Sequence, residues 1–294
     1  MIAVTAELLR SLPLPRHEQG DNKEGRGQVL VVGGCLAVPG AILLSAEGAL
    51  RAGAGKLQIA TCDTIAAHLG LVVPEAMVIG LPVTSDGHIG REAGNILSKY
   101  GSRAAATLIG PGMSGSDDTS QVVAALLESA GDAETAFILD AGALDALEHC
   151  SESLHRSARS AIITPHGGEM AKLLGVSREE VEAEPIRFAR EATARFHCVS
   201  VLKSVATYVT APDGREWIFE GGTIGLGTSG SGDVLAGVIA GLLARGTLPA
   251  EAALWGVYLH AEAGTRLTRR YGGIGLLARE LPGEIPAIMA SLTP

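Results

Sequence analysis

Short apolar runs alternate with helical patterns along most of the sequence, and this alternation constrains the fold more than any other feature. The run at residues 28–34, QVLVVGG, is typical of a buried strand that ends in glycines. Residues 39–55 carry Ala, Leu and Ile at helical spacing, with Pro39 near the start and glycines at the end. Strands that alternate with helices form βαβ units and a mostly parallel sheet with helices on both faces. We therefore expect an α/β fold, a three-layer α/β/α sandwich with a mostly parallel central sheet.

The alternation continues to Gly222, after which the pattern becomes purely helical. It runs through residues 56–61, 76–82, 106–114, 121–131, 136–144, 161–175, 196–212 and 216–222. Consecutive helices are predicted at residues 233–246, 249–267 and 276–292. No linker rich in Pro, Ser or charge interrupts the chain, so we expect one domain over residues 1–294, with residues 1–24 as an N-terminal extension.

Composition excludes several classes of function. The net charge is −9 and no cluster of Lys and Arg carries interleaved aromatic residues, so nucleic acid is not an expected partner. There is no signal peptide and no apolar run of membrane-spanning length, so we expect a cytoplasmic protein that has no membrane partner. The cysteines lie far apart without metal-ligand spacing, and we expect them to be small buried apolar residues: Cys35, Cys62, Cys150 and Cys198.

Four predicted loops have polar or glycine-rich sequences at the ends of strands. They are Gly33–Gly34 and residues 110–118, 140–144 and 164–169. Ligands of open parallel sheets bind at the carboxyl ends of the strands. The four loops are therefore expected to converge on one crevice.

The glycine-rich stretch before the first C-terminal helix is the strongest candidate for chemistry. Residues 225–230 match G-x-G-x-x-G, but Glu251, the acid some twenty residues on, lies in a helical pattern and not at a strand end, so we reject a dinucleotide site. Residues 228–233 are small, and their amides can form an anion hole at the helix start. Asp233 can then accept a proton from a substrate hydroxyl. The simpler alternative makes Ser231 and Asp233 ordinary helix caps.

The segment TPHGGE places Thr164, His166 and Glu169 directly after a strand. Glu169 could hold Mg²⁺ through water, because Mg²⁺ in proteins keeps several waters and uses few carboxylates. A helix cap explains the same spacing equally well.

Three further polar residues have a functional and a structural interpretation. Lys203 follows an apolar run and could meet nucleotide phosphate, although a lysine at a strand end is often simply solvated. Asp140 also follows a strand, where capping of a loop is common. His260 lies in a helical pattern and is expected to be packed or hydrogen-bonded.

Taken in order, these segments resemble one known family. The motifs GQVLVVGG, PGAILLSAEGALRAGAGKLQIAT, IGPGM, ILDAGAL, ITPHGGEMAKLLG, VLKSVATYVTAPDG, GLGTSGSGDVLAGVIAGLLARG and GVYLHAEAG are similar to those of the ADP/ATP-dependent NAD(P)H-hydrate dehydratases, of the ribokinase-like superfamily. The resemblance runs from about Gly25 to the C-terminus. It implies a nicotinamide-cofactor repair enzyme that phosphorylates the hydroxyl of the S epimer of NADHX or NADPHX and eliminates phosphate.

The resemblance also implies roles for individual residues. The catalytic base and anion hole are Asp233, Gly230, Ser231 and Gly232. The hydrate pocket is lined by Ala41, Gly112, His166 and Asp233. The adenine nucleotide, ADP or ATP, is held by Lys203, Ser204, Val205, Ala206, Thr207 and Gly232. Glu169 belongs to the magnesium-associated motif of the superfamily, which makes Mg²⁺ an expected cofactor.

Four positions depart from the family pattern, and two other kinds of function compete. The departures are Gly142, Ser204, Thr223 and Ile224.

A ribokinase-like kinase of a hydroxymethylpyrimidine, a hydroxyethylthiazole or a sugar would use the same base and anion hole, and a regulatory nucleotide-binding protein would keep the site without turnover. The resemblance implies a homo-oligomer, and we expect the epimerase of the pathway to be a separate chain because about two dozen residues precede the first predicted strand.

Overall fold

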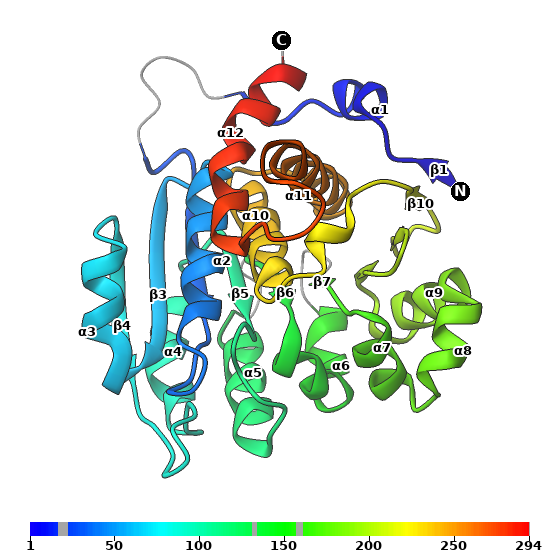
Figure 1. The fold of residues 1–294 in the computed structure, drawn as a ribbon. Coiled ribbons are helices and arrows are strands. Elements are labelled where there is room, and N and C mark those ends of the chain that lie inside the picture. Colours follow the sequence, from blue (N-terminus) through cyan, green and yellow to red (C-terminus); the bar gives the residue numbers. More distant parts are fainter. Residues whose placement is uncertain (17–22, 131–133, 157–160, 294) are drawn as a thin grey trace.

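A ten-stranded sheet forms the centre of the computed structural model, which describes residues 1–16, 23–130, 134–156 and 161–293 (Figure 1). Its strands are β1 (Ile2–Ala3), β2 (Gln28–Val32), β3 (Lys56–Cys62), β4 (Ala76–Leu81), β5 (Ala106–Ile109), β6 (Ala136–Leu139), β7 (Ile162–Ile163), β8 (Val199–Leu202), β9 (Thr207–Thr210) and β10 (Glu216–Phe219). They lie in the order β1-β10-β9-β8-β7-β6-β5-β2-β3-β4. Among the strands of the described residues, only β9 runs antiparallel to its neighbours, β8 and β10. The prediction of a mostly parallel sheet is confirmed.

Helices cover both faces of this sheet. They are α1 (Ala6–Ser11), α2 (Gly40–Arg51), α3 (Asp63–Val72), α4 (Ala93–Gly101), α5 (Asp117–Ala130), α6 (Leu147–Arg156), α7 (Gly167–Leu174), α8 (Arg178–Ala183), α9 (Pro185–Phe196), α10 (Ser231–Ala244), α11 (Pro249–Tyr271) and α12 (Leu281–Leu292), with short 3-10 helices η1 (Ala141–Ala146), η2 (Ile224–Leu226) and η3 (Ala278–Glu280). Helices α2, α10, α11 and α12 pack together on one face, and α4, α5, α6 and α9 lie on the other (Figure 1). The expected three-layer sandwich is therefore confirmed.

The strand order reverses between β2 and β5. The chain runs from β2 outward to β3 and β4 and then returns to the other side of β2. Such a reversal opens a crevice at the carboxyl ends of the two strands, which is where ligands of open α/β sheets bind. The loops at Gly33–Gly34 and Gly110–Gly112 begin at these strand ends.

Helices α2 and α10 pack closely because small residues face each other between them. A methyl group on Gly237 would overlap the carbonyl oxygen of Ser45, and one on Gly241 would overlap that of Ala49. These glycines let the two backbones approach, which suits a core that is poor in aromatic side chains. Part of the glycine-rich sequence around Asp233 therefore serves packing and not anion binding.

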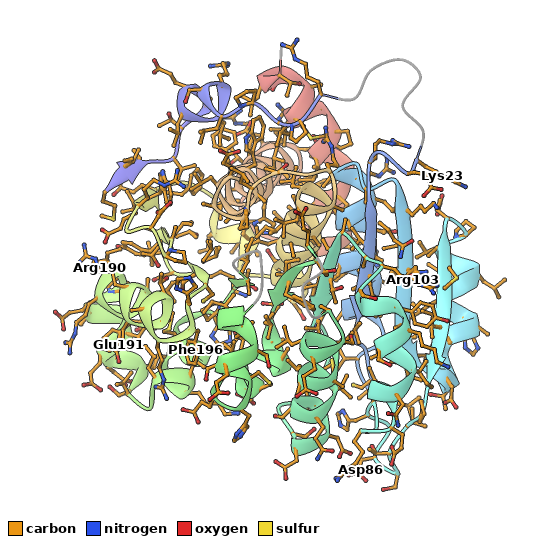
Figure 2. All side chains as sticks on the ribbon, turned by 180° about the vertical axis from the view of Figure 1, so that it is seen from behind. Lys23, Asp86, Arg103, Arg190, Glu191 and Phe196 are labelled. Carbon is orange, nitrogen blue, oxygen red and sulfur yellow. The ribbon has the colours of Figure 1, made fainter. Side chains whose placement is uncertain are left out.

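Helix α9, on the other face of the sheet, is amphipathic. Phe188 and Phe196 are buried, whereas Arg190 and Glu191 point outward from the helix (Figure 2). This amphipathic pattern buries one side of the helix and solvates the other.

The structure adds elements that the sequence pattern did not reveal. Residues 2–3 form an edge strand parallel to β10, so the run at residues 28–32 is the second strand and not the first. The Trp255 indole N–H donates to the carbonyl of Leu12 at 2.8 Å, which ties the start of the chain to α11. The sequence pattern predicts none of the helices α1, α3, α4, α6, α8 and α9, and the apolar run at residues 196–212 divides into β8 and β9. Within the predicted N-terminal extension, residues 17–22 lie outside the described part of the chain.

The four cysteines are buried and free, as expected. No helix in the described ranges is both long enough and apolar enough to cross a membrane.

Candidate active site

The four predicted strand-end loops meet at the carboxyl edge of β2, β5, β6 and β7. The Gly34 amide donates to the carbonyl of Pro111 at 2.7 Å. Gly110 has a φ of 123°, and a side chain there would overlap the carbonyl of Asp140. The Thr164 hydroxyl donates to Asp140 Oδ1 at 2.6 Å. The predicted convergence of these loops is therefore confirmed.

The glycine-rich turn forms the start of α10, beside these loops. Gly230 is the N-cap residue with a φ of 88°, a left-handed conformation that favours glycine. A side chain there would also overlap Leu44. Asp233 lies in the first turn, and its carbonyl accepts a hydrogen bond from the Ser45 hydroxyl at 2.9 Å. The Ser231 amide donates to the carbonyl of Thr228 at 3.2 Å. The helix start places the Asp233 carboxylate beside backbone amides, where the helix dipole favours negative charge.

The Ser231 side chain is hydrogen-bonded to His260 of α11. The two side chains are buried, and the Ser231 hydroxyl lies 2.9 Å from His260 Nε2. Burial lowers the pKa of His260 to about 4, so the ring is neutral near pH 7. The expectation that His260 is packed and hydrogen-bonded is confirmed, but its partner in the glycine-rich turn was not foreseen.

Asp233 is an acid of the site whose pKa is strongly raised. Burial is the largest cause and the negative charge of Asp140 the next, and together with Glu169 they raise the pKa of Asp233 to about 7 against the opposing effect of Lys203. A carboxyl group with a pKa near the working pH is well matched to a general base.

Lys203 connects the strand ends with the start of α10. Its Nζ lies 3.2 Å from Asp140 Oδ1 and 4.0 Å from Glu169 Oε2. A Cβ atom on Gly232 would be 3.2 Å from the same nitrogen. Burial disfavours the charged ammonium, but the carboxylates of Asp140, Glu169 and Asp233 outweigh it and raise the pKa of Lys203.

His166 and Glu169 form a reciprocal cap on α7. His166 Nδ1 accepts the amides of Gly168 and Glu169 at 3.0 and 3.2 Å, and Glu169 Oε2 accepts the His166 amide at 2.8 Å. The capping interpretation is therefore realised. It does not exclude a second role, because the His166 side chain is 59% exposed at the mouth of a cavity that it helps to line.

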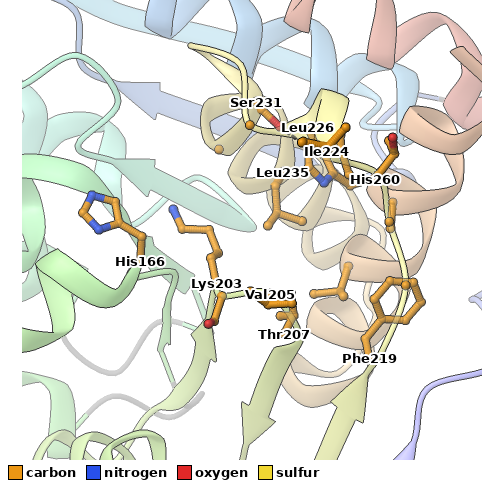
Figure 3. Close-up of a pocket in the computed structure, with 18 of the residues that line it drawn as sticks. His166, Lys203, Val205, Thr207, Phe219, Ile224, Leu226, Ser231, Leu235 and His260 are labelled. Atoms are coloured by element: carbon orange, nitrogen blue, oxygen red, sulfur yellow. Dashed lines mark hydrogen bonds between the residues drawn. The ribbon is translucent and has the colours of Figure 1, made fainter. Parts of the chain in front are cut away.

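That cavity has a volume of about 820 Å³ and lies between β8, β10, α10 and α11. Lys203 extends between His166 and the α10 residues Ser231 and Leu235 in this view (Figure 3). The predicted site residues that line it are His166, Lys203, Ser204, Val205, Thr207, Ser231 and Gly232. The lining does not include the predicted residues Ala206, Glu169, Gly230 and Asp233. The volume of the cavity suits a nucleotide-like ligand.

Ala41 and Gly112 lie together outside this cavity. A Cβ atom on Gly112, whose φ is 69°, would be 3.0 Å from the Ala41 side chain and 3.2 Å from Gly34 Cα. This places the pair where the loops after β2 and β5 meet the start of α2. The predicted site residues thus fall into two separate groups, one lining the cavity and one at the loops after β2 and β5, while Glu169, Gly230 and Asp233 lie at the starts of α7 and α10.

The four departures from the family pattern have different surroundings. A Cβ atom on Gly142 would lie 2.5 Å from the Met113 carbonyl oxygen, so the loop fits only glycine there. The Thr223 hydroxyl lies 2.9 Å from that of Thr268. Ser204 and Ile224 are exposed at the cavity.

The side chains do not fit a magnesium ion held by the protein alone. Throughout the described ranges, no group of three or more His, Cys, Asp and Glu side chains is arranged to hold a metal ion. The Glu169 carboxylate already caps α7 and faces Lys203. A direct metal site would need more free oxygen ligands.

The fold and the site together define a ribokinase-like protein. Its three-layer sandwich places a glycine-rich helix start with an aspartate at the carboxyl ends of parallel strands. A family model described as NAD(P)H-hydrate dehydratase matches residues 29–287, and the chain belongs to this family.

Relatives and solved structures agree with this membership. The ADP-dependent (S)-NAD(P)H-hydrate dehydratase of Xanthomonas campestris is 45% identical over 98% of this chain and 96% of its own. The bifunctional NAD(P)H-hydrate repair enzyme of Moorella thermoacetica is 35% identical over 98% of this chain, which spans 54% of that protein. The crystal structure of the ADP/ATP-dependent NAD(P)H-hydrate dehydratase of Bacillus subtilis, co-crystallised with ATP/Mg²⁺, has a TM-score of 0.83 at 30% identity and covers 99% of this chain and 98% of its own.

Proposed function

We propose that this protein is an ADP- or ATP-dependent (S)-NAD(P)H-hydrate dehydratase that repairs hydrated NADH and NADPH. Membership in the family and full-length similarity to the Xanthomonas campestris enzyme support the activity. The observation that carries the proposal is Asp233, a half-buried acid with a pKa raised to about 7 in the first turn of α10.

The first step is transfer of a phosphoryl group to the hydrate. Asp233 accepts the proton of the hydrate hydroxyl, whose oxygen forms a bond to the terminal phosphorus of the nucleotide as the bond from that phosphorus to the nucleotide breaks. The turn of Gly230, Ser231 and Gly232 at the start of α10 places the positive end of the helix dipole opposite the charge that develops on the phosphoryl oxygens. His260 fixes Ser231 and so keeps this turn in shape.

The second step restores the reduced nicotinamide. Electrons of the ring nitrogen help to break the carbon–oxygen bond, phosphate leaves with the bonding pair, and loss of a ring proton re-forms the double bond. The net products are NADH or NADPH, phosphate and a nucleotide shortened by one phosphoryl group.

The two substrates occupy neighbouring parts of the site. The nucleotide takes the cavity of about 820 Å³, held by Gly232 and the segment from Lys203 to Thr207. The hydrate binds beside Ala41 and Gly112 and is contacted there by His166 and Asp233. Gly112 packs against Ala41 and Gly34, which brings the loop after β5 against the loop after β2 and the start of α2, where this substrate would bind.

Magnesium accompanies the nucleotide in this proposal. The Bacillus subtilis structure was co-crystallised with ATP/Mg²⁺. The expected water-mediated role of Glu169 stays a prediction, and its contacts favour a different one, developed below.

The chain acts as one domain in this proposal, with the epimerase supplied separately and the catalytic chain assembled as a homo-oligomer. The Moorella thermoacetica relative is bifunctional, and this chain spans about half of it.

The deciding experiment follows the absorbance of the dihydronicotinamide with hydrated NADH, Mg²⁺ and either ADP or ATP. Absorbance should rise with at least one nucleotide and stay flat in Asp233→Asn. A flat trace with both nucleotides refutes the repair function. A phosphorylated small alcohol in place of free phosphate would indicate a kinase instead.

A further inference from the structure

One ammonium group lies among three carboxylates where a ribokinase-like protein would be expected to hold a metal ion. Lys203 Nζ is 3.2 Å from Asp140 Oδ1 and 4.0 Å from Glu169 Oε2, and the negative charge of Asp233 acts on it as well. The acids come from the end of β6, the start of α7 and the first turn of α10. A single side chain from the end of β8 thus connects all three elements.

One carboxylate oxygen of Asp140 and one of Glu169 already accept hydrogen bonds. Asp140 Oδ1 accepts the Thr164 hydroxyl at 2.6 Å in addition to Lys203. Glu169 Oε2 accepts the amide of His166. Mg²⁺ demands oxygen ligands at about 2.0–2.1 Å in near-octahedral geometry and gives up its water reluctantly. These oxygens are arranged for hydrogen bonds to an ammonium group and not for a metal shell.

Lys203 is also fixed at its backbone. Its amide donates to the carbonyl of Pro165 at 2.8 Å, and it forms a parallel bridge with His166. The Asp140 side chain is 4% exposed, so its charge would be costly to bury without a cation. Three carboxylates around the ammonium favour its charged form.

We propose that the Lys203 ammonium is the resident cation of the Asp140, Glu169 and Asp233 cluster and that it excludes Mg²⁺ from this position. The protein therefore has a positive charge at the glycine-rich turn before any nucleotide binds. A Cβ on Gly232 would be 3.2 Å from the ammonium nitrogen, so this charge faces the proposed anion hole directly. A role of this charge in catalysis rests on the proposed function. The exclusion of Mg²⁺ from the cluster is independent of it.

The test measures binding of Mn²⁺, used as a spectroscopic probe for Mg²⁺, by electron paramagnetic resonance without nucleotide. The unsubstituted protein should leave the signal of free Mn²⁺ unchanged at equimolar metal. Lys203→Ala opens the cluster and should bind Mn²⁺ at least about tenfold more tightly than the unsubstituted protein, because three carboxylates then lack a cation. The added change Glu169→Gln should remove that gain.

Lys172→Ala is the matched control. Lys172 Nζ pairs with Asp145 at 2.6 Å on the exposed surface, so its loss also frees a carboxylate but leaves the cluster intact. Circular dichroism verifies that each variant folds. If Lys203→Ala does not fold, Lys203→Ser is used, since its hydroxyl can still donate a hydrogen bond while it leaves room for the ion.

Three results would overturn the inference. The first is equimolar Mn²⁺ binding by the unsubstituted protein that Glu169→Gln abolishes. The second is a folded Lys203 variant that binds no more Mn²⁺ than the unsubstituted protein, and the third is an equal gain in Lys172→Ala. Because neither nucleotide nor hydrate is present, these results are independent of whether the protein dehydrates NAD(P)H hydrates.

Discussion

Replacing Asp233 with asparagine is expected to stabilise the folded protein at alkaline pH while it abolishes turnover. Burial, followed by the charge of Asp140, raises the pKa of Asp233 from 3.8 to about 7 in the folded state. Between these values the unfolded chain has lost the proton and the folded chain retains it, so stability falls as pH rises, by about 1.4 kcal/mol per pH unit. Ionisation of Asp233 therefore destabilises the folded state. This loss of stability is absent below the pKa that Asp233 has in the unfolded chain, and it is complete above its pKa in the folded protein, where it reaches up to about 4 kcal/mol.

Unfolding in urea at pH 5 and pH 8 measures this loss of stability. The fluorescence of the two tryptophans, Trp217 and Trp255, reports unfolding because both are buried. Asparagine cannot ionise, so relative to the unsubstituted protein the variant should gain roughly 2–3 kcal/mol more at pH 8 than at pH 5. Asp117→Asn is the control, because Asp117 also lies in the first turn of a helix but is exposed. It should show no such dependence on pH.

The same variant tests the catalytic role of the group. Loss of a general base typically costs 10²- to 10⁴-fold in rate, whereas the amides that face the nucleotide remain. Turnover should therefore be lost while nucleotide binding, measured by calorimetry, persists. A stability difference that does not change with pH, or a variant less stable than the parent at pH 8, would refute the electrostatic reasoning.

Three further predictions concern the rate and the packing of the site. The kcat/KM for the hydrate should rise with pH through about 7, because Asp233 must lose its proton; a profile that is flat across this range contradicts a base with that pKa. Gly237→Ala should cost about 1–3 kcal/mol in urea unfolding, because the methyl group would overlap the Ser45 carbonyl. Gly283→Ala, in open space on α12, should instead stabilise by about 0.5–1 kcal/mol, and equal effects would refute the packing argument. Gly142→Asp, which restores the acid of the family pattern, should lower the melting temperature because its Cβ would meet the backbone of the facing loop, and an unchanged temperature would show that this loop yields.

The sequence alone predicted the layered architecture because hydrophobic period is a local property. The run at residues 28–32 and the helical spacing of residues 39–55 became β2 and α2 with small shifts at their ends. Short elements escaped prediction for the same reason. The edge strand at residues 2–3 is too short to carry a period, and it is defined only by its pairing with β10.

The candidate site was reached partly by chemistry and partly by family resemblance. Glycines before Asp233 indicated an anion hole, and the polar strand ends indicated a crevice. The assignment of Ala41 and Gly112 had no local signal and came from resemblance alone. His260 gave a weak signal, a histidine in an apolar helix, which did not indicate its partner.

What the sequence by itself determined is the alternation of strands and helices from residue 28 onward, the loops at the strand ends and the candidate base. Only the tertiary structure decided the partners of these groups. Lys203 meets Asp140 across 63 residues, and Ser231 meets His260 across 29. The glycines of α10 likewise acquire their packing role only where α2 lies against them. Contacts between distant residues depend on how strands and helices stack, and a local pattern of residue types does not encode them.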